Sequence, residues 1–342
     1  MTDLYPHDCP ADGPQYPGED AGHPIDRSSQ AVLLMAYGSI ESLDQVPAYY
    51  THIRGGRPPA PEQLEELLGR YRAIGGASPL SGHTERQRAA VQAALSARGV
   101  DVPVYAAMKH IAPFIGDVVG GIARSGVTNV VAMALAPHFS TMSACAYCHA
   151  VAEGRDAAAA SGSPLTFEMV RDWHDEPRFV EALAAAAGEA LARFPAAAAP
   201  HVVFTAHSLP ERILERSDPY RDVLLDTARL VAARLGLAAE RWSFAFQSAG
   251  RTPDPWLGPD LGVHLGGLAS GGTRDVVVCP VGFVSDHLEV LYDIDIEAQD
   301  EARRLGIRLE RARSMNDDRT FIAGIADVLE RRLVVPEAMT VA

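Results

Sequence analysis

The stretch HVVFTAHSLP at residues 201–210 carries the pattern that decides the fold, a short apolar run that ends at a polar residue, His207. Runs of the same kind occur at 31–36, 102–107, 128–135, 165–170, 242–247 and 275–281, with a further one at 307–311. Longer amphipathic stretches separate them, at 42–54, 60–73, 84–98, 112–125, 144–161, 178–193, 219–235, 286–304 and 317–332. Continuous apolar strands that alternate with helices predict an α/β fold with parallel sheets flanked by helices.

The chain of 342 residues is longer than one hydrophobic core usually supports, so two domains are expected. The sequence VVAMALAPHFS at 130–140 weakly resembles VVCPVGFVS at 277–285, which favours two similar Rossmann-like halves. We therefore predict a flexible tail over 1–28, a first α/β domain over 29–174 and a second over 175–342. The C-terminal helix is expected to pack back on the first domain.

Composition excludes several classes of function. The formal charge of −14 argues against a nucleic-acid partner, because such binding depends on Lys and Arg. The only lysine, Lys109, is not part of a phosphate-binding P-loop, and neither first strand is followed by Gly-x-Gly-x-x-Gly. No run approaches the roughly 20 apolar residues that span a bilayer, and no targeting signal is readable at the N-terminus. A cytoplasmic location without a transmembrane segment is the prediction.

Three acidic residues, Glu289, Asp293 and Glu297, recur at intervals of four and would form one stripe on a helix. Taken alone, such a stripe is most often a solvated helix face. However, like charges at this spacing repel, and no Lys or Arg lies between Glu289 and Glu297. A divalent cation such as Fe²⁺ or Mg²⁺, which accepts oxygen ligands, would relieve the repulsion.

His207 is the leading candidate for a catalytic base. A lone histidine is more often a hydrogen-bonded structural residue, but this one ends a strand, and open parallel sheets bind ligands beyond the carboxyl ends of their strands. An imidazole there can bind metal or accept a proton near neutral pH. The same rule predicts that Tyr37, the 137–147 loop and the 280–289 turn border a site with His207.

Many short stretches together resemble the ferrochelatases, and they occur in family order between residues 31 and 297. They are MAYG at 35–38, YTHIR at 50–54, YRAIGGASPL at 71–80, KHIAPFI at 109–115, APHFS at 136–140, AHSLP at 206–210, QS at 247–248, TPDPWLGPD at 252–260 and PVGFVSDHLE at 280–289. The resemblance is closest to the bacterial branch that metallates coproporphyrin III, because Tyr37 stands where that branch has a tyrosine facing the macrocycle.

The resemblance implies an enzyme of haem b biosynthesis that inserts Fe²⁺ into coproporphyrin III to give coproheme, in a porphyrin cleft between the two domains. It makes His207 and Glu289 the catalytic metal and proton pair, and Asp293 and Glu297 the continuation of the acidic path. It also implies that the porphyrin-binding positions are Tyr37, Arg54, Arg70, Ser78 and Tyr147. The branch often has a second Arg after Arg54, where this chain has Gly55, so one propionate contact is either missing or supplied by Arg57.

Other readings stay open at this point. A protoporphyrin IX ferrochelatase, a cobalt or nickel chelatase and a non-catalytic haem or porphyrin carrier would share many of these residues. The resemblance also leaves room for transient contact with neighbouring haem-pathway enzymes. The cysteines Cys9, Cys145, Cys148 and Cys279 supply the four thiolates of a [2Fe–2S] cluster, as some bacterial ferrochelatases have. We expect no such cofactor, because Cys9 falls in the predicted tail and Cys279 in a predicted buried strand.

Overall fold

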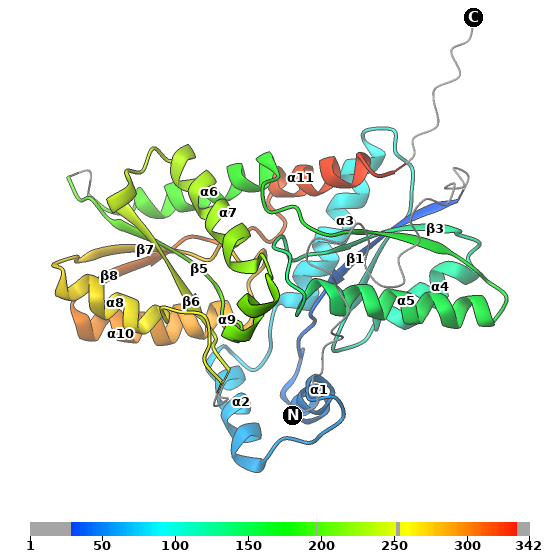
Figure 1. The fold of residues 1–342 in the computed structure, drawn as a ribbon, viewed down its shortest axis with the longest axis horizontal. Helices are drawn as coiled ribbons and strands as arrows, with labels where there is room; N and C mark the ends of the chain where they lie inside the picture. The colour runs from blue at the N-terminus through cyan, green and yellow to red at the C-terminus, as the bar shows by residue number, and fades with distance from the viewer. Residues whose placement is uncertain (1–28, 196, 251–253, 334–342) are drawn as a thin grey trace, which may run out of the picture.

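Two parallel four-stranded sheets lie at the centre of the computed structural model, which describes residues 29–195, 197–250 and 254–333 (Figure 1). The first sheet has the order β2-β1-β3-β4, with β1 at Gln30–Ala36, β2 at Val104–Met108, β3 at Asn129–Ala134 and β4 at Thr166–Val170. The second has the order β6-β5-β7-β8, with β5 at His201–His207, β6 at Trp242–Gln247, β7 at Asp275–Cys279 and β8 at Arg308–Arg311. The matching orders confirm two similar α/β halves.

Helices cover both faces of each sheet. Those of the first half are α1 at Val46–Ile53, α2 at Pro61–Ala73, α3 at Leu80–Ser96, α4 at Ile115–Arg124 and α5 at Ala144–Ala160. Those of the second half are α6 at Pro177–Leu191, α7 at Tyr220–Arg234, α8 at Leu261–Ser270, α9 at Leu288–Leu291, α10 at Gln299–Leu305 and α11 at Arg319–Glu330. In the described residues no helix has both the length and the apolar character to span a membrane.

Two helical predictions needed correction. Helix α8 was missed because its sequence, LGVHLGGLAS, contains three glycines, which disfavour helix. Asp260 is the signal that could have found it, since its side chain accepts hydrogen bonds from the backbone N–H groups of Gly262 and Val263. The single helix expected over 286–304 is instead α9, a π-helical segment at Asp293–Ala298, and α10.

Alternate residues of each buried strand face different helix layers, as the twofold period of a strand requires. In the second sheet, Val202 and Phe204 face the layer with α6 and α7, whereas Val203 packs toward α8 and α10. In the first sheet, Val32 and its alternating neighbours share the layer with α3, and Leu33 faces α4 and α5. Because both strand faces are buried, these strands are apolar along their whole length.

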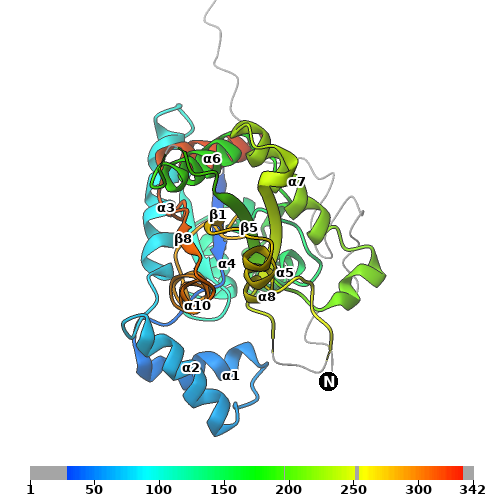
Figure 2. The same cartoon turned by 90° about the vertical axis from the view of Figure 1, so that its left-hand side faces the viewer.

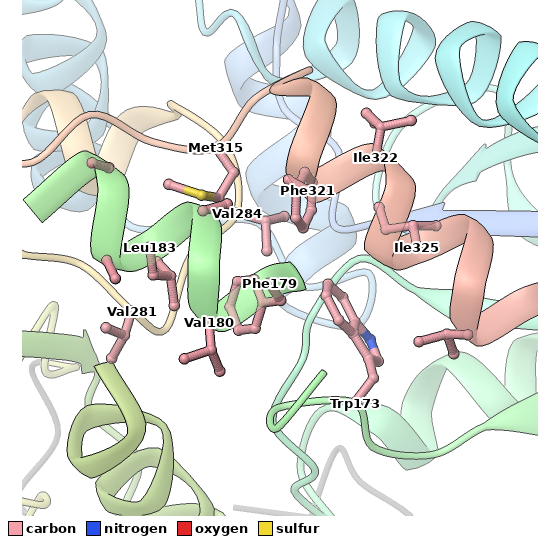
Figure 3. Packing of buried hydrophobic residues seen from close by; sticks show 14 of the residues in the cluster. Trp173, Phe179, Val180, Leu183, Val281, Val284, Met315, Phe321, Ile322 and Ile325 are labelled. Carbon is pink, nitrogen blue, oxygen red and sulfur yellow. The ribbon is translucent and has the colours of Figure 1, made fainter. Parts of the chain in front are cut away.

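One hydrophobic core runs through both halves (Figure 3). It joins the inner faces of the two sheets to α3, α6, α7 and α11. At its centre, Trp173 follows β4, Phe179 belongs to α6 and Phe321 to α11, with ring centroids 5.2–6.0 Å apart. Helix α11 packs against α3 of the first half and α6 of the second. The halves are therefore held in one orientation by a shared core.

A smaller core stands apart from the shared one. Helices α1 and α2 project from one side of the molecule (Figure 2), and Tyr49 and Tyr71 are buried between them with Ile40 and Val46. Leu288, the first residue of α9, packs against this cluster. The projecting pair is thereby anchored next to the helix that carries Glu289.

Truncation of Phe179 tests the shared core. Its side chain is fully buried, so Phe179→Ala should lower the free energy of unfolding by about 3–5 kcal/mol through lost burial and a cavity. Urea denaturation followed by circular dichroism measures this. The matched apolar truncation Val263→Ala, at an exposed position of α8, should change it by less than about 0.5 kcal/mol. A loss below about 1 kcal/mol for Phe179→Ala would contradict the role given to this core.

Candidate active site

His207 is the last residue of β5, at the carboxyl edge of the second sheet. Its Nδ1 forms a hydrogen bond with the carbonyl oxygen of Ser208. Because a carbonyl oxygen can only accept, Nδ1 carries a proton, and in the neutral ring Nε2 therefore has a lone pair. Nε2 lies 3.6 Å from Oε1 of Glu289. The main-chain carbonyl of His207 accepts a hydrogen bond of 3.0 Å from the hydroxyl of Tyr220. In its neutral form the imidazole thus presents a lone pair beside a carboxylate.

A close backbone approach brings Glu289 to this place. The turn after β7 crosses β5 at Gly282, where a Cβ atom would lie 2.4 Å from the Cβ of Ala206. No other residue type fits there without moving β5, whose next residue is His207. Gln247 also holds the Glu289 backbone in place, since its side-chain amide donates a 2.9 Å hydrogen bond to the Glu289 carbonyl.

A second histidine flanks Glu289 on its other side, and the sequence analysis did not single it out. His287 lies with Nε2 3.5 Å from Oε2 of Glu289, and its Nδ1 donates to the Ser285 carbonyl at 2.9 Å. Desolvation alone would raise the pKa of Glu289, but the positive charges of His207 and His287 in their protonated forms, together with the charge of Arg70, outweigh it and lower the pKa to about 2. Desolvation would lower the pKa of His287, yet Glu289 raises it above its ordinary value. Glu289 is therefore an anion held between two imidazoles.

The acidic stripe differs from the prediction. Asp293 and Glu297 lie in the π-helical segment, in which the Glu297 N–H bonds the Tyr292 carbonyl five residues back, so the even α-helical spacing is lost. Asp293 is 8% exposed and Glu297 is exposed. Exposure therefore does not rise steadily along the three residues, because Glu289 is half-buried, Asp293 is buried and Glu297 is exposed.

Asp293 also has a cation nearby that the local sequence does not supply. Arg70, from α2, approaches its Oδ1 to 3.8 Å, and the Ser248 hydroxyl donates to its Oδ2. Oδ1 has no hydrogen-bond partner although it is buried. Burial and the charge of Glu289 outweigh Ser248 and Arg70, and they raise the pKa of Asp293 to about 6. Two neighbouring carboxyl groups thus differ widely in acidity, a pattern typical of sites that move protons.

The residues assigned to porphyrin binding lie in four places, one of which is the position of Arg70 beside Asp293. Tyr37, 42% exposed, shares the amino group of Lys109 with Tyr147, at 5.8 and 5.6 Å from the two ring centroids. Arg54 ends α1, with its guanidinium 5.7 Å from the Tyr50 ring and a buried Nε without a hydrogen-bond partner. Ser78 is buried.

Ser78 uses its polar atoms locally. Its N–H donates to the Ile40 carbonyl at 3.0 Å, and its hydroxyl accepts from the N–H of Leu80 at the start of α3. Tyr49 lies beside the segment that carries Tyr37, because its hydroxyl donates a 2.9 Å hydrogen bond to the Gly38 carbonyl. The small core of α1 and α2 therefore contacts both the segment that follows β1, through Tyr49, and the start of α9, through Leu288.

The described cysteines do not fit a shared iron–sulfur cluster. Cys145 and Cys148 are buried in the core between the first sheet and α4 and α5. Cys279 is buried in the shared core on the other side of that sheet, and burial raises the pKa of its thiol to about 12. Cys9 lies outside the described residues.

The raised pKa of Asp293 makes a pH-dependent stability prediction. The folded protein binds this proton more tightly than the unfolded chain, so the associated stability is present below the ordinary pKa and is lost as the pH rises through about 6. A shift of about two units corresponds to roughly 3 kcal/mol. Asp293→Asn should therefore gain stability relative to the parent protein as the pH rises from 4.5 to 8, measured by urea denaturation. Asp222→Asn, at an exposed carboxylate, is the matched control, and a pH-independent difference for Asp293→Asn would contradict the assignment.

Comparison with known proteins identifies the family of the chain. The family profile described as Ferrochelatase matches residues 29–333. A Ferrochelatase of Herpetosiphon aurantiacus is 44% identical over 295 residues, covering 85% of this chain and 95% of its own. A Coproporphyrin III ferrochelatase of Geobacillus thermodenitrificans is 40% identical over 313 residues, covering 90% and 97%. The fold resembles that of SirB from Bacillus subtilis with Fe³⁺, with a TM-score of 0.56 at 11% identity over 90% of this chain and 96% of that one. The chain belongs to the ferrochelatase family.

Proposed function

We propose that this chain inserts Fe²⁺ into coproporphyrin III to form coproheme, as a step of haem b biosynthesis. The observation that carries the proposal is the pair formed by the Nε2 lone pair of His207 and the carboxylate of Glu289, 3.6 Å apart at the carboxyl edge of the second sheet. Insertion of Fe²⁺ into a porphyrin releases two pyrrole protons, so the site must handle a dication and two protons with no net change of charge. The pair offers one acceptor for a proton and one anion for the dication.

The residues can divide the work as follows. A porphyrin that is puckered exposes its nitrogen lone pairs, so binding a distorted ring lowers the barrier to metal entry. His207 Nε2 accepts a pyrrole proton, and Glu289, whose pKa of about 2 keeps it ionised, balances the charge on the resulting imidazolium or on the incoming iron. Asp293, with its pKa of about 6, can take up the second of the two protons and release it near neutral pH. Exposed Glu297 completes the path to water.

The choice of metal and the choice between enzyme and carrier rest on different arguments. Imidazole and carboxylate ligands also accept cobalt and nickel, so iron is inferred from the family and not from ligand chemistry. A porphyrin carrier has no use for a carboxyl group with a depressed pKa beside one with a raised pKa, whereas a proton-releasing reaction does. We therefore favour catalysis over carriage. Cytoplasmic location, transient contact with neighbouring pathway enzymes and the lack of an iron–sulfur cofactor stay predictions.

Substitution of the pair tests the catalytic assignment. His207→Ala and Glu289→Gln should each slow anaerobic Fe²⁺ insertion by a factor on the order of 10²–10⁴, while the porphyrin still binds, because both residues act on metal and protons. Glu297→Ala should cost much less, since its side chain is exposed, and Asp293→Ala should fall between. Insertion by His207→Ala at nearly the parental rate would refute the assignment, and equal losses at Glu289, Asp293 and Glu297 would indicate a structural stripe instead.

The coproporphyrin assignment rests on Tyr37 and on arginines that could hold propionates. Arg54 is the better candidate of the two arginines, because its buried Nε has no hydrogen-bond partner, whereas Arg70 lies beside Asp293 and Glu66. Coproporphyrin III carries four propionates, and protoporphyrin IX has vinyl groups in place of two of them. Relatives at about 40% identity carry both family names, so the branch needs a direct test.

Substrate preference provides that test. One or two charge-assisted contacts, each worth roughly 1.5–3 kcal/mol, should make coproporphyrin III the better substrate by about tenfold or more in kcat/KM. Arg54→Ala should raise the KM for coproporphyrin and narrow the preference. Arg72→Ala, an exposed arginine of α2 paired with Glu65, is the matched control and should leave both unchanged. A parental enzyme that prefers protoporphyrin IX would refute the branch while leaving ferrochelatase activity intact.

A further inference from the structure

A carboxylate buried between the two halves receives hydrogen bonds from both of them. Asp218, 5% exposed, lies just before α7. Its Oδ2 accepts from the Ser140 hydroxyl at 3.1 Å, the Thr141 N–H at 2.7 Å and the Thr141 hydroxyl at 2.5 Å. Its Oδ1 accepts from the Tyr220 N–H at 2.9 Å. Four donors from two segments that lie about 80 residues apart in the sequence thus meet on one side chain.

The hydrogen bonds to Oδ2 of Asp218 connect this residue to the turn that begins α5. The carbonyl of Ser140 accepts hydrogen bonds from the N–H groups of Ser143 and Ala144, at 3.1 and 2.9 Å, so the turn held by Asp218 is the one that starts this helix. Tyr147 follows in its first turn, 5.6 Å from the Lys109 amino group that also faces Tyr37. A shift of the turn would shift this part of the proposed porphyrin site.

The hydrogen bond to Oδ1 connects Asp218 to His207 through Tyr220. Tyr220 begins α7, and its hydroxyl donates to the His207 carbonyl at 3.0 Å. Burial, with the charges of Glu289 and Asp218, raises the pKa of Tyr220, so its hydroxyl stays a neutral donor. Asp218 thereby fixes the backbone of His207 through one intervening residue.

The two halves do not need the hydrogen bonds of Asp218 to stay together. The shared hydrophobic core already joins them, and burying a carboxylate is costly unless its hydrogen bonds are satisfied. Within the described residues no Arg, Lys or His forms an ion pair with Asp218, so hydroxyl and amide donors alone satisfy it. Such donors define direction more narrowly than apolar packing does. The free-energy cost of burying Asp218 is explained if its carboxylate fixes the positions of the two segments relative to each other.

We propose that Asp218 is a positioning residue of the insertion reaction, which sets His207 of the second half relative to the Tyr147 segment of the first. The proposal rests on the function proposed above. Asp218 has two sets of contacts, which we call the Tyr220 arm, through Oδ1, and the Thr141 arm, through Oδ2. Loss of the Tyr220 hydroxyl should misplace His207 without changing the porphyrin-binding segment. Loss of the Thr141 hydroxyl should loosen that segment and leave His207 in place.

Two single-group variants separate these effects. Tyr220→Phe should lower kcat about five- to tenfold, the effect of one lost hydrogen bond, with an unchanged dissociation constant for metal-free coproporphyrin measured by fluorescence titration. Thr141→Val should raise that dissociation constant by a similar factor and change kcat little. Asp218→Asn should change both. Two control variants remove the same groups away from the site: Tyr105→Phe at a half-buried strand position and Thr84→Val at a buried helix position. They should change neither kcat nor the dissociation constant.

The melting temperature of every variant completes the experiment. If Tyr220→Phe and Thr141→Val lower only the melting temperature, as their controls do, Asp218 is a structural residue and the proposal is overturned. A loss of kcat and of affinity together in both single variants would also overturn it, because the two arms would not be separate. If the parental protein inserts no iron into either porphyrin, the proposed function fails, while the dissociation constant still reports on the Thr141 arm.

Discussion

The packing of Trp173, Phe179 and Phe321 in one aromatic cluster is the interaction on which the rest of the structure depends (Figure 3). These rings come from the end of the first half, the first helix of the second and the C-terminal helix, so the core cannot form in either half alone. Parallel strands of one sheet all end at one edge, and fixing two sheets together therefore fixes two such edges relative to each other. The position of His207 beside the 280–289 turn and the 137–147 segment follows from that constraint.

Within this frame, the chemistry arises from unequal environments for similar groups. Glu289 and Asp293 are only four residues apart, yet the charges of the flanking histidines in their protonated forms lower the pKa of the first, whereas burial and the charge of Glu289 raise that of the second. The same low-dielectric surroundings that strengthen a paired charge penalise an unpaired one. A site that must accept a dication and release two protons can use both conditions, one group to hold charge and one to exchange protons.

The π-helical segment shows how local geometry is altered at this site. Its wider turn costs regular hydrogen bonding, and such segments occur mostly at functional positions. Here it turns Asp293 inward against Arg70 and Ser248, while Glu297 stays exposed. Arg70 comes from the projecting pair α1 and α2, whose small core is anchored on Leu288. Asp293 is thereby connected to the projecting pair of helices next to which Arg54 lies.

The sequence by itself determined the strands and most helices, because apolar runs report burial on both strand faces. The pairing of His207 with Glu289 came from the resemblance to the ferrochelatases. The sequence missed α8, whose glycines hide a helix that tertiary packing stabilises, and it could not predict the π-helical segment, since both windings suit the same acidic sequence. Only the tertiary structure decided that His287 flanks Glu289, that Arg70 reaches Asp293 and that Asp218 joins the halves. These contacts link residues whose spacing in the chain carries no periodic signal, so they exist only once the shared core has set the two sheets in place.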